Sequence, residues 1–208
     1  MNLSRTSVLT VLVVAVGACG RGGATTKGLN QIVTPDIQPV GVLSLSFQGQ
    51  HKGIGNSLQF QTEYGVTPRF EVAFFEGLKP GLQTAAAEYG LLVHGPYLLS
   101  TGFTNWSSNG GAPQPFLEGG YYVGAHKAVA GLLRNGPHSE TVLGYAYQAN
   151  PALLLQVDYQ SGEGNSATAG FTYNFTPTLS INPALYRTNA SRHNTLGYAV
   201  LTWNIKID

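Results

Sequence analysis

Hydrophobic and polar residues alternate along most of the chain after residue 40. The stretch 62–75, TEYGVTPRFEVAFF, shows the alternation most clearly, with two runs joined at a Thr-Pro turn. Successive side chains of a strand point to opposite faces, so a period of two gives one apolar and one polar face. Runs of this kind predict about twelve strands, at 40–50, 57–66, 69–76, 82–92, 97–106, 114–123, 128–134, 141–148, 152–161, 166–175, 179–187 and 195–205.

The alternating runs recur with a period. Tyr64, Tyr89, Tyr147 and Tyr173 each stand a few residues before a proline-containing turn, after which a new run begins. The repeat of roughly 27 residues fits two strands of about 9–11 residues and two short connections, which is the length that crosses a membrane in a barrel. An ordinary β-meander of hairpins is the alternative interpretation.

Composition favours the membrane barrel. Charged residues make up 10% of the chain, against roughly 25% in soluble domains. In the clearest strands the apolar face carries no acid or base, as lipid demands, because a charge at the bilayer midplane costs roughly 2–4 kcal/mol. The sequence therefore predicts an all-β fold, a single antiparallel transmembrane β-barrel over residues 40–208. Its predicted lipid-facing residues include Phe47, Phe60, Phe74, Tyr89, Leu117, Val157, Phe171 and Leu201.

The N-terminus has the features of an export signal. Residues 1–18 combine one basic residue, Arg5, with an apolar run too short to span a membrane, which predicts a secretory signal peptide. The following cysteine, Cys19, completes a Val-Gly-Ala-Cys sequence that resembles a bacterial lipobox, in which the cysteine becomes lipidated. Simple cleavage that leaves Cys19 as a thiol is the alternative. Residues 19–39 lack clear periodicity and are expected to form a periplasmic tether.

The stretch 62–75 resembles a hairpin of bacterial outer-membrane β-barrel proteins, among them the transporter family labelled for the phenol-degradation meta pathway. Weaker similarity follows at 147–157 and 173–181. The resemblance implies a β-barrel architecture, a location in the outer membrane of a Gram-negative bacterium and insertion by the barrel-assembly machinery. It does not imply a substrate. Many such barrels end on an aromatic residue, whereas this chain ends at Asp208.

Six charged residues fall on the predicted luminal face or beside its turns. We expect Glu63, Arg69 and Glu71 to gather at the periplasmic mouth, because they flank one tight turn. A salt-bridge network that fills the lumen and a filter that selects solutes are both compatible with the pattern. If the lumen is wet, the excess of acids predicts a mild preference for cations. The luminal set is Glu63, Arg69, Glu71, Glu88, Glu118 and Asp158.

The sequence gives little support for a catalytic or metal-binding site. Its five histidines form no HxH or HxxxH pair, so no metal site and no cofactor are expected. His138-Ser139-Glu140 is the only local group of catalytic residue types, and neighbours in a strand point apart. We therefore expect no enzyme. The net charge of +1 gives no reason to expect nucleic acid as a partner.

These observations predict a narrow outer-membrane pore for small solutes, with membrane lipid around it and an undetermined oligomeric state. The alternative is a closed structural or anchoring barrel, its lumen blocked by Tyr122, Tyr186 and Trp106. A third interpretation, a lipid-modifying hydrolase of the outer membrane, would need a Ser–His pair that the fold brings together.

Overall fold

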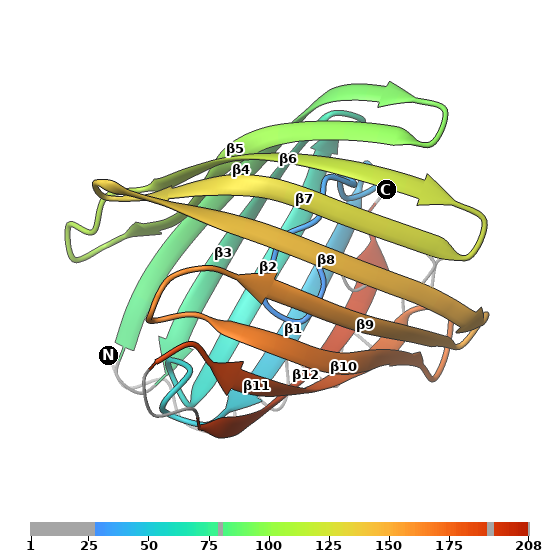
Figure 1. The fold of residues 1–208 in the computed structure, drawn as a ribbon. Coiled ribbons are helices and arrows are strands. Elements are labelled where there is room, and N and C mark those ends of the chain that lie inside the picture. Colours follow the sequence, from blue (N-terminus) through green and yellow to red (C-terminus); the bar gives the residue numbers. More distant parts are fainter. Residues whose placement is uncertain (1–27, 79–80, 191–193, 208) are drawn as a thin grey trace.

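The computed structural model describes residues 28–78, 81–190 and 194–207. In them, antiparallel strands form one closed barrel, in which consecutive strands pair and β1 pairs with β12 (Figure 1). None of these residues belongs to a helix long and apolar enough to cross a membrane. The strands are β1 Val42–Gln50, β2 Leu58–Thr67, β3 Phe70–Leu78, β4 Gly81–His94, β5 Tyr97–Ser107, β6 Gln114–Val123, β7 His126–Asn135, β8 His138–Asn150, β9 Leu153–Gln160, β10 Ser166–Asn174, β11 Leu179–Thr188 and β12 Thr195–Lys206.

This architecture confirms the predicted fold, the strand number and the up-and-down order. The period-two pattern also assigned the two faces correctly. Large apolar side chains point outward and are exposed, for example Phe74 at 60% and Val157 at 48%. The opposite positions, among them Ser44, Glu88 and Thr168, point inward and are buried. The barrel therefore has an apolar outside and a polar inside, the reverse of a water-soluble barrel.

The two ends of the barrel differ. Short turns follow the even-numbered strands, and we call that end the turn end. At the opposite end, the loop end, the connections after β1, β5, β9 and β11 are longer, whereas those after β3 and β7 are also short. Outward aromatic residues gather near the turn end, as the tyrosine repeat predicts. Tyr97 and Tyr121 are cross-strand partners with ring centroids 5.2 Å apart. Tyr173 and Phe175 stack edge to face at 5.3 Å.

Residues 28–40, here called the inner segment, lie inside the barrel (Figure 1, dark blue). Its side chains Leu29, Asn30 and Ile32 are between 3% and 7% exposed. The described part of the expected tether is therefore packed against the inner wall and is not a free linker. Periodicity could not predict this, because an irregular segment takes its shape from the wall that it contacts. Residues 1–27, including the signal peptide and Cys19, lie outside the described residues.

Gly41 turns the chain from the inner segment into β1. Its φ of +73° lies in the left-handed region that favours glycine, and a Cβ there would meet Ile207 O at 2.8 Å. Hydrogen bonds fix the corner on both sides: Gly41 N donates to Gly65 O at 2.9 Å, and Ile207 N donates to Gly41 O at 2.7 Å. The inner segment thus enters the lumen from the turn end.

Candidate functional site

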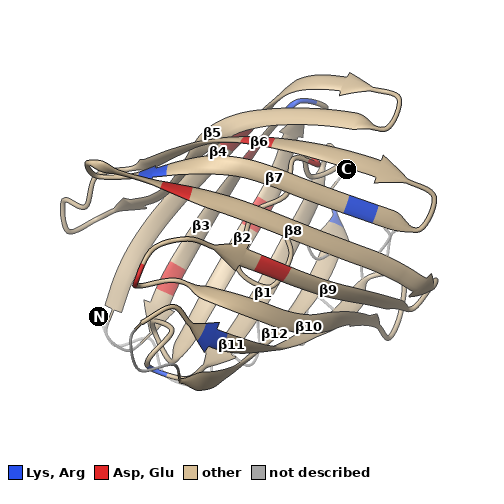
Figure 2. Ribbon diagram, viewed as in Figure 1, with Lys and Arg blue, Asp and Glu red and all other residues tan. Residues whose placement is uncertain are grey.

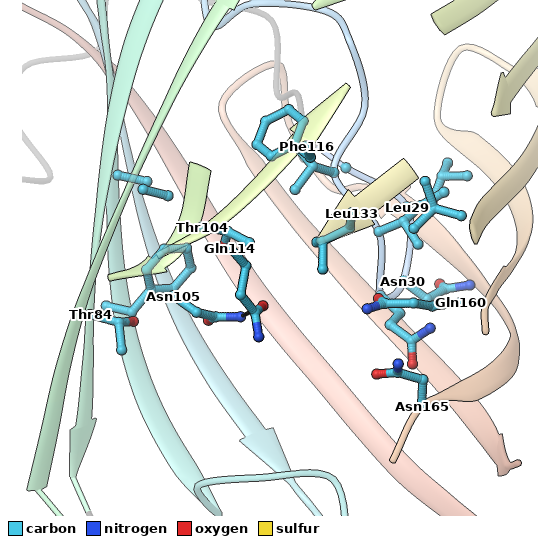
Figure 3. A pocket seen from close by; sticks show the side chains of 18 of the residues that line it. Leu29, Asn30, Thr84, Thr104, Asn105, Gln114, Phe116, Leu133, Gln160 and Asn165 are labelled. Atoms are coloured by element: carbon cyan, nitrogen blue, oxygen red, sulfur yellow. Dashed lines mark hydrogen bonds between the residues drawn. The ribbon is translucent and has the colours of Figure 1, made fainter. Parts of the chain in front are cut away.

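A cavity of about 400 Å³ occupies the loop-end half of the lumen (Figure 3). We call it the cup. Its floor is the start of the inner segment, residues 28–33. Amide side chains dominate its wall, with Asn105 and Gln114 on one side and Gln160 on the other (Figure 3). Asn105 is the one described non-glycine residue with positive φ, and its Nδ2 donates to Gln114 Oε1 at 2.7 Å.

The lumen is filled toward the turn end. Gln48 and Ser44 lie on the same inward face of β1, four positions apart. Gln48 lines the cup and is partly exposed, whereas Ser44 is 5% exposed. On the neighbouring strands Thr202, Asn204 and Ser180 are at most 2% exposed although they point inward. These polar side chains are thus shielded from bulk solvent, although a second cavity of about 30 Å³ lies beside Ser44, Ser46 and Thr202. The lumen in this structure is a cup closed at its base.

Four of the predicted luminal acids, Glu63, Glu71, Glu88 and Glu118, line the cup. Figure 2 marks in red where acidic residues lie along the strands. Glu71 and Glu88 are direct cross-strand partners on β3 and β4, and both are buried. Glu63 on β2 and Glu118 on β6 flank them and are 6% and 2% exposed. The four side chains lie on the inner side of the wall, and their role in selecting solutes stays a prediction.

The other two predicted residues lie elsewhere. Arg69 is exposed in the β2–β3 turn, and the expected gathering of Arg69 with Glu63 and Glu71 does not occur. A residue in a tight turn leaves the alternation of the strands, so parity could not place it. Asp158 faces inward on β9 but is absent from the cup lining. Its carboxylate instead holds the inner segment.

Asn30 is the centre of the polar contacts between the inner segment and the wall. Its backbone N–H donates to Asp158 Oδ2 at 2.7 Å, and Tyr186 OH donates to its carbonyl at 2.5 Å. The side-chain amide donates to Thr168 Oγ1 at 3.0 Å. Its Oδ1 accepts from Gln156 Nε2 at 2.8 Å and from Asn182 at 3.3 Å. Strands β9, β10 and β11 thus satisfy every polar group of this residue.

Further contacts hold the rest of the inner segment. Gln38 N donates to Glu71 Oε2 at 2.5 Å, and Gln38 Nε2 donates to Ser44 Oγ. Near the turn end, Tyr122 OH donates to Asp36 Oδ1 at 2.7 Å. Lys127 Nζ lies 3.6 Å from Asp36 Oδ2 and 4.8 Å from the centre of the Tyr122 ring. The segment therefore contacts the wall along its whole length.

An apolar cluster completes the packing. Leu29 and Ile32 contact Val129, Val142 and Ala146, which point inward from β7 and β8. The sequence analysis did not identify this contact. The sequence nevertheless indicated it, because β7 and β8 carry apolar residues on both faces, whereas contact with lipid requires them only on the outward face. Apolar residues facing a lumen need a partner that covers them.

The residues expected to block the lumen divide into two groups. Tyr186 and Tyr122 point inward and bind the inner segment. Trp106 is 57% exposed and does not line the cup. The group His138-Ser139-Glu140 is separated by the strand geometry: His138 and Ser139 are exposed, while Glu140 is buried and accepts from Asn135 and Gln160. Among the described residues no three His, Cys, Asp or Glu side chains gather as metal ligands do.

The structure is similar to those of known porins. It superposes on the KdgM porin with a TM-score of 0.56 and 11% identity, covering 78% of this chain and 98% of that chain. A structure of the KdgM porin in complex with disordered oligogalacturonate gives a TM-score of 0.55 at 12% identity, over 78% and 98% of the two chains. The NanC porin gives 0.54 at 8% identity, over 79% and 100%. At these identities the likeness concerns the fold.

No protein-family model matches the sequence, and no curated protein matches it. The resemblance of residues 62–75 to the phenol-degradation transporters therefore stays a prediction. What the comparisons show is a fold shared with outer-membrane porins.

Proposed function

We propose that this protein is an outer-membrane barrel that forms a narrow pore for small solutes and prefers cations. The observation that carries the proposal is the cup, whose lining contains Glu63, Glu71, Glu88 and Glu118. Carboxylates in a poorly hydrated lumen attract cations and repel anions more strongly than they would in bulk water.

The location is supported by the outer surface. Exposed Phe, Leu, Val and Tyr side chains surround the barrel, and aromatic residues gather near its turn end. Water would not favour so large an apolar surface, whereas the acyl chains of a bilayer would. Short turns of outer-membrane barrels face the periplasm. The turn end is therefore placed on the periplasmic side, and the cup opens to the cell exterior.

The charge of the cup argues against one class of solute. The KdgM porin has been solved with oligogalacturonate, a chain of uronic acids that carries many negative charges. The acids that line the cup here would repel such a polymer. We therefore propose small cationic or neutral solutes with hydrogen-bonding groups, for which the glutamine and asparagine side chains of the wall provide donors and acceptors.

Ion selectivity in planar bilayers tests the proposal. In a potassium chloride gradient, the reversal potential of the refolded protein should indicate a preference for potassium. Glu63→Gln and Glu118→Gln should each move the reversal potential toward zero, because each removes one charge from the cup. Glu76→Gln is the matched control, since Glu76 is exposed and outside the cup lining. Equal shifts in all three variants, or a preference for chloride, would contradict the proposal.

The filled turn-end half favours a second candidate, a closed structural or anchoring barrel. Inward residues such as Asn204 are 1% exposed there, so solutes have no evident exit while the inner segment is seated. A folded, heat-modifiable barrel that never conducts in any variant would support this second candidate. Catalysis has no comparable support from the site.

We further propose that residues 1–18 direct export, that Cys19 is lipidated after cleavage, and that the barrel-assembly machinery inserts the protein. These proposals rest on the sequence alone.

A further inference from the structure

We propose that the inner segment is a gate, and that solutes pass the turn end of the barrel only when residues 28–40 leave their seat. This inference rests on the proposed function as a pore. Three features support it: the shape of the wall that faces the segment, the polar contacts between segment and wall, and the single connection of the segment to the barrel at Gly41.

The wall provides a seat of five inward glycines, one on each even-numbered strand from β2 to β10. A Cβ on Gly120 would lie 2.8 Å from Pro35 Cγ, and one on Gly170 would lie 2.5 Å from Asn30 Oδ1. A Cβ on Gly90 would lie 3.1 Å from Ile37 Cγ1. On Gly65 it would meet backbone oxygens of the segment, and on Gly144 the ends of Leu29 and Ile32. The full set is Gly65, Gly90, Gly120, Gly144 and Gly170.

The order of these contacts traces a path around the lumen. Gly65 meets residues 38 and 39, Gly120 meets residue 35, and Gly144 and Gly170 meet residues 29, 30 and 32. The segment therefore runs along the wall from β2 to β10 as it is followed back from Gly41. Space for it is built into five separate strands, which distinguishes a seat from an accidental contact.

The contacts that hold the segment are of a kind that water can replace. The contacts of Asn30 are hydrogen bonds, and at the turn end Asp36 and Lys127 are 40% and 37% exposed. Apolar contacts add to these bonds at Leu29 and Ile32, and also at Pro35 and Ile37, which lie against Gly120 and Gly90. Release would exchange these hydrogen bonds for bonds to water in the lumen, which lowers its net cost below the sum of the bonds that break.

The barrel does not need the segment for closure. Strands β1 and β12 pair along the whole of Val42–Gln50, and consecutive strands complete the ring. The segment joins this ring at one point, the left-handed Gly41. A segment that joins the ring at Gly41, lies in a groove of glycines and is not required for the wall is suited to move while the barrel stays intact.

A disulfide lock tests the gate. In a Cys19→Ser background, Pro35→Cys and Gly120→Cys bring two thiols close together, because a Cβ at position 120 would lie 2.8 Å from Pro35 Cγ, near the position of a cysteine sulfur at residue 35. Mass spectrometry confirms bond formation in the refolded protein. We expect the oxidised form to show no conductance steps and the reduced form to conduct like the Cys19→Ser parent. Both single variants serve as controls for folding.

A substitution that weakens the binding of the inner segment gives a second test, in which we expect more conductance and not less. Asn30→Ala removes four side-chain hydrogen bonds and leaves buried amides on Gln156 and Asn182 without this partner. The ratio of open to closed time should rise about tenfold. An unchanged ratio, or an oxidised lock that conducts like the reduced form, would overturn the gate while the pore stands. Absence of conductance in every variant, with the barrel folded, would overturn both.

Discussion

Asp158 and Asn30 lie 128 positions apart in the sequence, yet Asp158 Oδ2 accepts the backbone N–H of Asn30 at 2.7 Å inside the barrel. The same oxygen accepts the N–H of Gln31 at 3.2 Å. Both the acid and Asn30 are at most 5% exposed. Asp158, which the sequence placed only in the luminal set of charged residues, therefore ties the start of the inner segment to β9.

Asp158→Ala should loosen this end of the segment. Hydrogen bonds to charged groups contribute about 1.5–3 kcal/mol each, and the substitution removes two of them while leaving two buried N–H groups. Amide hydrogen exchange at Asn30 and Gln31 should accelerate at least about tenfold. Ser46→Ala is the control, because Ser46 Oγ bonds to Thr202 Oγ1 on the wall at 2.9 Å. Unaltered exchange in Asp158→Ala would contradict the assigned contact.

Two adjacent glycines offer a matched test of the seat. Gly120→Ala should destabilise the folded protein by about 1–3 kcal/mol, because its methyl group would press against Pro35 and Tyr122, with contacts of 2.8 and 3.0 Å. Gly119→Ala should change stability little, since its nearest contacts are 3.8 Å or longer. Urea unfolding in lipid vesicles measures both free energies. Equal losses of stability in the two variants would mean that Gly120 matters as a residue of the strand and not through its contact with the inner segment.

The outward face should behave as a lipid-facing surface. Val157 lies near the middle of β9 and is 48% exposed. Val157→Arg should reduce the free energy of unfolding in a bilayer by about 2–4 kcal/mol. Gln61→Arg, which places the same charge in the cup, should cost much less because water reaches it. If both substitutions were tolerated equally, the barrel would not be embedded in lipid along β9.

Lipidation at Cys19 is predicted from the sequence alone. The mature protein from a Gram-negative host should carry the added mass of a lipid on its N-terminal cysteine, and Cys19→Ser should remove that mass and halt normal maturation. A Cys19→Ser precursor that matures as usual, with no difference in lipid mass, would favour simple cleavage by a signal peptidase.

The sequence predicted the wall well because the rule that shapes it is local. Alternation placed every strand within about three residues of its observed bounds and assigned Phe74 outward and Glu88 inward. It also placed a turn between the predicted strands 114–123 and 128–134, where the structure has the turn at Gly124. Arg69 was misplaced because turn residues do not follow the alternation of the strands that they join.

The inner segment could not be predicted in the same way. Its contacts join residues more than a hundred positions apart, such as Gln31 and Ser166, and no period links them. Two clues exist in the sequence but become meaningful only with the barrel in view. One is the recurrence of an inward residue followed two positions later by glycine, as at Glu63 and Gly65. The other is the apolar inward parity of β7 and β8.

The most direct test of the account is the reactivity of two cysteines on the same face of β1. In a Cys19→Ser background, Gln48→Cys places a thiol in the cup, and Ser44→Cys places one under the inner segment. A charged, water-soluble thiol reagent should modify the cysteine at position 48 rapidly and the cysteine at position 44 at least about tenfold more slowly, because the seated segment excludes water. Equal rates at both positions would show an open lumen and would contradict the account.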